Sequence, residues 1–208
     1  MCVVCGCGTP VTPAPGAAGE GDPVQVDPVT GDLRTNGKGY VQAGWVNLGQ
    51  IETSGIDVSV KGTVKTDVGV FTPGWEATYR LSDKSKLFDT DPLTNNLGKY
   101  ALSGPSIRLK QTFSLNWKLG PWAVTGNYYW QSGYEDQTPD RQVSSYETMD
   151  IQTAYTGIKN LTLVAGIRNL MDRIPPLSNQ GQYFQVGFDP TYSDVKLRTF
   201  YARVAYKF

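Results

Sequence analysis

The stretch SIRLKQTFSLNWKLGPWAVTGNYYWQ, residues 106–131, decides the fold of this chain. Apolar or aromatic residues alternate with polar ones on both sides of a break at Gly120-Pro121. A period of two places successive side chains on opposite faces of a strand. The apolar face would carry Ile107, Leu109, Phe113, Leu115, Trp117 and Leu119, with Gln111 among them, and then Trp122, Val124, Gly126, Tyr128 and Trp130. Two such segments joined by so tight a turn predict an antiparallel hairpin.

The same alternation recurs along most of the chain. The other predicted strands are 39–48, 51–65, 70–82, 146–156, 161–171 and 197–208. Short turns near 66–69 and 157–160 would close two further hairpins. The last stretch, RTFYARVAYKF at 198–208, alternates in the same way and ends on Phe208. The pattern therefore predicts about eight strands.

Connection lengths indicate what covers the apolar faces. Short turns at 66–69, 119–121 and 157–160 alternate with long loops at 83–104, 132–145 and 172–196. Long loops are uncommon in compact soluble domains, but short turns at one rim and long loops at the other are typical of outer-membrane barrels. No run approaches the ~20 apolar residues of a spanning helix, whereas a spanning strand needs only about 9–11 residues. The sequence predicts an all-β fold, an antiparallel transmembrane β-barrel segment.

A soluble, carbohydrate-binding β-sandwich stays open as an alternative, because its strands also alternate. The charges on the polar faces favour the barrel, since a wide water-filled lumen solvates them easily. These charged residues are Arg108, Lys110, Lys118, Arg168, Arg203 and Lys207. A sandwich would be recovered in the soluble fraction without detergent.

Composition argues against several function classes. The chain has 19 basic and 19 acidic residues, so no nucleic-acid partner held by net charge is expected. It has no histidine, which removes Ser-His-Asp and Cys-His catalysis and the commonest metal ligand. No residue stands out as a catalytic group, so we expect neither an enzyme nor a cofactor. Residues 1–20 lack a basic n-region and an apolar h-region, so no signal peptide is expected in this chain.

Two parts of the sequence resemble TonB-dependent outer-membrane receptors. Residues 168–208 look like their C-terminal end: an N-L-F/M-D element typical of the penultimate strand is N-L-M-D at 169–172, and the terminal aromatic-x-Phe is Y-K-F at 206–208. VNLGQIETSGIDVSV, 46–60, is similar to the N-x-G…G-V/I-E signature, with Asp57 where glutamate is usual. The resemblance covers residues 39–208 and is most specific near the end of the chain.

The resemblance implies a larger barrel of about 22 strands in a Gram-negative outer membrane, with a plug domain in its lumen. It implies uptake of a bulky, scarce nutrient (a siderophore, cobalamin or an oligosaccharide) driven by TonB, which acts through the plug. The plug is missing here, so residues 39–208 would supply only barrel wall and loops. Residues 1–38, irregular and rich in Gly and Pro, would be part of an extracellular loop. A self-contained barrel of about eight strands, serving as an anchor or adhesin, stays open.

The resemblance also gives the chain's end a role. In outer-membrane proteins the final strand is read by the barrel-assembly machinery. Tyr206 and Phe208 are therefore predicted to form the assembly signal. The plainer alternative is that Phe208 packs at the barrel rim.

Two further groups of residues are candidate sites. The loop at 173–196 carries Tyr183, Phe184, Phe188 and Tyr192 beside the amides of Asn179, Gln180 and Gln182. Such a set suits stacking on a sugar ring or an aromatic ligand, and it equally suits a loop packed on its own side chains. Near the N-terminus the sequence has Cys2, Cys5 and Cys7. A structural zinc ion usually takes four ligands, so a loop disulfide is favoured over a metal, with one cysteine left over.

Overall fold

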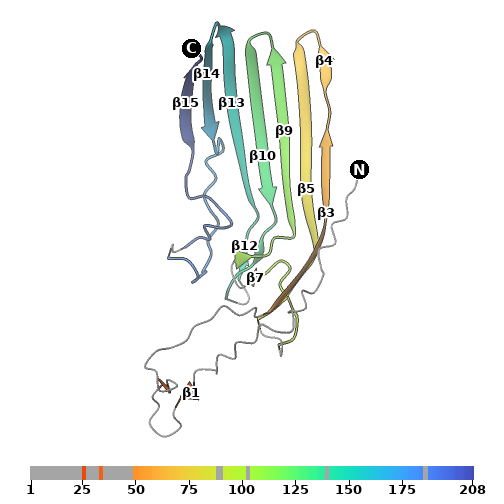
Figure 1. Ribbon diagram of the computed structural model, residues 1–208, viewed down its shortest axis with the longest axis vertical. Coiled ribbons are helices and arrows are strands. Elements are labelled where there is room, and N and C mark those ends of the chain that lie inside the picture. The colour runs from red at the N-terminus through yellow and green to blue at the C-terminus, as the bar shows by residue number, and fades with distance from the viewer. Residues whose placement is uncertain are drawn as a thin grey trace.

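The computed structural model describes residues 25–26, 33–34, 49–87, 91–101, 104–138, 141–184 and 187–208. Its main feature is an antiparallel sheet whose long strands follow the order β15-β14-β13-β10-β9-β5-β3 (Figure 1). These strands are β3 (Gln50–Lys61), β5 (Gly69–Lys86), β9 (Leu109–Leu119), β10 (Trp122–Gln131), β13 (Tyr146–Ile158), β14 (Leu161–Arg168) and β15 (Thr199–Tyr206). Each long strand lies beside the next one along the chain, so the sheet is an up-and-down meander.

The other described strands are short. Two of them pair with β5: β4 (Val64–Thr66) and β6 (Thr94–Asn95). The others form three separate two-stranded sheets: β1 (Gln25–Val26) with β2 (Leu33–Arg34), β7 (Tyr100–Ala101) with β8 (Gly104–Pro105), and β11 (Tyr134–Glu135) with β12 (Gln142–Val143). Figure 1 places the short turns at one end of the sheet and the long connections at the other. We call these the turn end and the loop end. Within the described ranges no helix has the length and apolar character needed to cross a membrane.

The three predicted hairpins are confirmed: β9 with β10, β13 with β14, and β3 and β4 with β5. The predicted strand at 39–48 lies outside the described residues, as does most of the predicted irregular segment at 1–38. The strand predicted over 161–171 ends at Arg168 instead. The reason is local, because Asn169 has a φ of 49° and a strand does not take left-handed backbone.

Strand β5 continues to Lys86, beyond its predicted end at residue 82, and it carries a β-bulge. Gly55 lies opposite Arg80 and Ser54 lies opposite Ser82, so Leu81 is an extra residue on β5. The extra residue reverses the alternation and brings Asp83 to the face that holds Arg80. Arg80 Nη1 lies 2.8 Å from Asp83 Oδ2, a contact that residues three apart in a regular strand would not make.

Strand register joins the predicted apolar faces into one surface. In one row across five strands, Val60 pairs with Trp75, Trp75 with Phe113, Phe113 with Tyr128, and Tyr128 with Met149. Rows on either side continue the pattern as far as β15, where Ala165 pairs with Ala202 and Leu163 with Val204. Many large apolar side chains on this face are exposed, among them Val60, Phe113, Leu115, Trp122, Phe200 and Val204. The opposite face, which we call the polar face, carries mainly hydroxyl, amide and charged side chains.

The arrangement is that of a barrel wall. A β-sandwich needs a second large sheet packed on the apolar face, and within the described residues the three other sheets are two-stranded. The path of strands begins at β15 and ends at β3, and these two edge strands are not paired with each other. The described strands are therefore an open, curved segment rather than a closed small barrel.

The tightly buried residues gather near the loop end rather than along the wall. The buried apolar side chains are those of Leu97, Ile107, Tyr134, Val143, Tyr146, Val164 and Tyr192. All but Val164 lie in the long connections or at the start of β13. The buried polar residues show the same distribution, and among them are Asp136, Ser178, Gln180 and Asp189.

Candidate functional site

Two neighbouring features at the loop end form the candidate site: a packed set of loops, and a cavity beneath it on the polar face. The centre of the loops is an apolar cluster of Ile107, Tyr134, Val143, Tyr146 and Tyr192. The rings of Tyr134 and Tyr192 meet edge to face with their centroids 5.0 Å apart. The cluster joins the connections β5–β9, β10–β13 and β14–β15, so it fixes them relative to one another.

Tyr192 is the residue through which the last connection is attached. Its side chain is only 5% exposed, and its hydroxyl donates to the carbonyl of Ser144 at 2.9 Å, with the carbonyl of Ser132 at 3.1 Å. The Gln131 amide donates to the Tyr192 carbonyl at 2.5 Å. Burial raises the pKa of the Tyr192 phenol, and burial likewise raises the pKa of Tyr134. Both phenols therefore stay protonated, and Tyr192 remains a hydrogen-bond donor at neutral pH.

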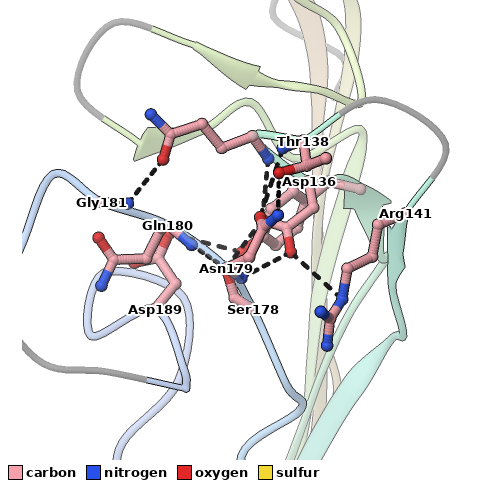
Figure 2. A network of polar contacts seen from close by, with 10 residues as sticks. Asp136, Thr138, Arg141, Ser178, Asn179, Gln180, Gly181 and Asp189 are labelled. Atoms are coloured by element: carbon pink, nitrogen blue, oxygen red, sulfur yellow. Dashed lines mark hydrogen bonds and ion pairs between the residues drawn. The ribbon is translucent and has the colours of Figure 1, made fainter.

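Asp136 ties two of the connections together through its carboxylate (Figure 2). Its side chain has no exposed surface, and it accepts hydrogen bonds from Ser178 Oγ at 2.9 Å and from the Asn179 backbone N–H at 2.8 Å. The Gln137 backbone N–H donates to it as well, at 2.9 Å. Arg141 Nε lies 3.8 Å from the same carboxylate. A buried carboxylate with this many donors stabilises the loops only while its partners are in place.

Asp189 organises the turn that presents Tyr192. Its carboxylate accepts hydrogen bonds from the Thr191 N–H and hydroxyl, each at 2.7 Å, and its carbonyl accepts from the Ser193 N–H at 3.0 Å. Pro190 follows it directly in the sequence. An acidic residue before proline favours turn initiation, and its side chain satisfies the N–H groups of the turn. This local chemistry sets the direction of the Tyr192 side chain.

The N-L-M-D element, residues 169–172, lies at the start of the same connection, and its backbone angles and hydrogen bonds account for its residue types. Asn169 and Asp172 have φ of 49° and 54°, in the left-handed region that Asn and Asp tolerate best. The Asn169 amide closes a loop by bonding both the N–H and the carbonyl of Arg173, at 2.8 and 2.9 Å. The Asp172 carboxylate accepts from the N–H of Arg198, at 2.8 Å, next to the start of β15. The element thus ends β14 and guides the chain toward β15.

A cavity of about 340 Å³ lies on the polar face beneath the packed loops, and we call it the wall cavity. Its wall consists of two adjacent rows of side chains across β5, β9, β10 and β13. The first row is Thr78, Lys110, Gln131 and Tyr146, and the second is Glu76, Thr112, Tyr129 and Thr148. Tyr192 also contributes to the lining, so cavity and loops share a boundary. Such a concave site with convergent polar groups and aromatic rings is typical of ligand pockets.

A family model described as TonB dependent receptor-like, beta-barrel, matches residues 17–170. The chain belongs to this family. The match includes the strands β3 to β14 and stops before β15.

Among solved structures, the chain is similar to one titled Copper transporter OprC, with 18% sequence identity and a TM-score of 0.40. That likeness covers 78% of this chain and 30% of the other, so the receptor segment spans less than a third of that protein's length. No curated protein matches the chain.

The structure separates the four aromatic residues predicted to contact a ligand in the connection between β14 and β15. Tyr192 is buried in the apolar cluster, whereas Phe184 is 89% exposed. Tyr183 and Phe188 are half-buried, and their carbonyls lie within hydrogen-bond distance of the Gln180 amide. Only Tyr192 borders the wall cavity.

The remaining predicted site residues of the receptor lie elsewhere. Tyr206 ends β15 at the turn end, and its ring meets that of Phe208 with centroids 5.2 Å apart. Both side chains are exposed, Tyr206 at the end of the edge strand and Phe208 two residues beyond it. Cys2, Cys5 and Cys7 lie outside the described residues.

Sequence reasoning missed the wall-side residues of the cavity, namely Glu76, Thr112, Tyr129 and Thr148. The alternation assigned such residues to the polar face, but a pattern within one strand does not say which residues of neighbouring strands lie beside them. Register supplies that information, and register here follows from the short turns that close the hairpins. Pairing the predicted hairpins through those turns would have brought Thr112 and Tyr129 together.

Proposed function

We propose that this chain supplies wall and loops of an outer-membrane receptor that takes up a bulky, scarce nutrient in a Gram-negative bacterium. The observation that carries the proposal is the two-faced sheet of a receptor-family chain, apolar on one face and polar on the other from β3 to β15. Lipid would contact the apolar face, since that face exposes large apolar side chains. The polar face would line the water-filled path of the nutrient.

In this mechanism the loop end faces outward and captures the ligand. The packed connections present a preformed surface, which lowers the entropy lost on binding. A plug domain, contributed by other parts of the receptor, would relay occupancy to TonB, and TonB would open the path. Residues 39–208 act as wall and loops in this scheme, and residues 1–38 as part of an extracellular loop.

Tyr206 and Phe208 are proposed to act before transport, as the signal for the barrel-assembly machinery. Their place supports this role, because they are exposed at one end of an edge strand whose outer side has no paired strand among the described residues. The final strand is therefore accessible to an assembly factor while the rest of the barrel closes. The proposed nutrient belongs to one of three ligand classes: siderophores, cobalamin or oligosaccharides.

Fractionation combined with uptake tests the proposal. Outer membranes from the native host are probed with an antibody against residues 176–196, and accumulation of radiolabelled candidate nutrients is compared in cells with and without TonB. We expect the protein in the outer-membrane fraction and accumulation that depends on TonB. A band only in the soluble fraction contradicts the proposal, and a membrane band at 22.8 kDa without TonB-dependent uptake favours a small anchoring barrel.

A further inference from the structure

The lining of the wall cavity carries balanced charge. Its wall rows include one carboxylate, Glu76, and one ammonium group, Lys110, among hydroxyl and amide side chains. A site for an anionic metal chelate would gather several cations, because a multiply charged ligand must be neutralised as it loses water. Here the hydroxyls of Thr112 and Thr148 provide both donors and acceptors instead, whereas the Thr78 hydroxyl donates to Asp57 at 2.6 Å.

The exposed aromatic surface of the cavity comes from Tyr129. Its side chain is 40% exposed, whereas Tyr146 and Tyr192 are buried and their hydroxyls point to backbone carbonyls. Tyr129 is thus the cavity tyrosine whose ring remains open to a ligand. In the wall it lies directly between Thr112 and Thr148. A flat ring flanked by hydroxyls matches a sugar, which has an apolar face of C–H groups and a rim of hydroxyls.

Toward the turn end, the next two rows of the polar face are uncharged on β9 and β10, and the nearest charges are Asp150 beside Asn127 on β13 and Lys118 near the end of β9. The next rows toward the turn end pair Ser114 with Asn127 and Asn116 with Thr125. The Asn116 amide donates to the Thr125 hydroxyl at 2.7 Å. A ligand leaving the cavity along β9 and β10 would first exchange one set of neutral hydrogen bonds for another, before it reaches Lys118 at the turn end.

We propose that the wall cavity binds a neutral, hydroxyl-rich ligand, an oligosaccharide, with one sugar ring stacked on Tyr129 and its hydroxyls bonded by Glu76, Thr112 and Thr148. The inference rests on the receptor function proposed above and narrows its ligand class. It places recognition on the wall beneath the loops rather than on the exposed aromatic residue of the loop, Phe184.

Calorimetric titration of the receptor that carries these residues tests the proposal. The receptor is purified in an amine-oxide detergent, because detergents with sugar headgroups would compete. The probes are neutral malto-, xylo- and cello-oligosaccharides, ferric siderophores and cyanocobalamin. The variants are Tyr129→Ala, Tyr129→Phe and Thr112→Val. The control is Thr162→Val, a half-buried threonine on the same face at the turn end.

We expect saturable binding of at least one oligosaccharide. Tyr129→Ala should weaken it about tenfold because the stacking ring is lost, and Thr112→Val about threefold to tenfold because a hydroxyl partner is lost. Tyr129→Phe and Thr162→Val should bind like the parent receptor. Binding of ferric siderophores or cobalamin alone, binding of no probe, or oligosaccharide binding insensitive to Tyr129→Ala and Thr112→Val would each overturn the proposal.

The outcomes separate this inference from the function on which it rests. TonB-dependent accumulation of a ferric siderophore would leave the receptor function standing and remove the oligosaccharide assignment. Absence of the protein from the outer membrane would remove the receptor function itself.

Discussion

Along the wall, few residues of the long strands are buried, and neighbouring strands are held mainly by backbone ladders. At the loop end, by contrast, Tyr134 is 1% exposed and buried carboxylates are surrounded by donors. In the proposed receptor, the wall would be completed by lipid and by strands beyond its edges, whereas the loop end carries its own packed interior. The wall and the loop end are therefore stabilised by different interactions, and substitutions in each part should change different measurements.

The largest effect should follow Tyr192→Ala. Removing a buried aromatic side chain costs about 4 kcal/mol, and the lost hydroxyl no longer joins the connections β10–β13 and β14–β15. Limited proteolysis of detergent-purified receptor should show rapid cleavage in the long loops while the heat-modifiable migration of the barrel is unchanged. Tyr192→Phe, which keeps the ring, should cost only about 1 kcal/mol. Loss of barrel migration in Tyr192→Ala would show that wall and loop end are not independent.

Leu115→Arg and Ser114→Arg test the two faces of the wall with neighbouring residues. Leu115 is on the apolar face, where an arginine near the bilayer midplane costs about 3 kcal/mol, whereas Ser114 is on the polar face, where arginine meets water. Urea unfolding from lipid vesicles should show the large loss for Leu115→Arg and nearly none for Ser114→Arg. Equal losses would mean that lipid does not cover the apolar face.

Asp136→Ala should weaken the loop end by about 2 kcal/mol, because it leaves the donors of Ser178, Asn179 and Gln137 without their shared acceptor. Hydrogen exchange of the β11–β12 turn and of the segment around Ser178 should accelerate together. Asp194→Ala, an exposed aspartate in the same connection as Ser178, serves as the control and should change little. Acceleration at only one of the two segments would argue against a shared carboxylate.

Alkaline pH should produce the smallest effect. Burial raises the pKa of Tyr134 and Tyr192 above the ordinary value of 10.0, so the folded loop end disfavours the phenolate. Their contribution to stability is complete below pH 10.0 and falls as the pH rises above it. Loop hydrogen exchange, corrected for intrinsic rates, should therefore rise only above that pH. Tyr134→Phe should reduce the rise, and an unchanged profile would contradict the assignment.

How far the sequence predicts the structure also differs between the two parts. The wall follows from local signals: alternation assigns each side chain to a face, and the Gly120-Pro121 break and its counterparts close the hairpins. The bulge at Leu81 cannot be predicted in this way, because in the sequence an extra residue only interrupts the alternation of polar and apolar residues. The contacts of the loop end are still harder to predict from the sequence, since Gln131 and Tyr192 are 61 residues apart and no repeat links them. Tyr192 was predicted as a ligand contact and lies buried at the cavity boundary, a place that only the packing of three connections defines.

The contacts of Tyr192 also bear on the order in which the protein assembles. Each hairpin of the wall is closed by a few residues, so its ends meet at low entropic cost. The Tyr192 hydroxyl instead joins residues 48 and 60 positions earlier in the chain, which must already be held near each other by β10 and β13. Non-local contacts of this kind form late, because their closure entropy is repaid only once the intervening strands are paired. The wall can therefore grow hairpin by hairpin, whereas the loops pack together only after β14 has joined the sheet and the chain beyond it has folded back.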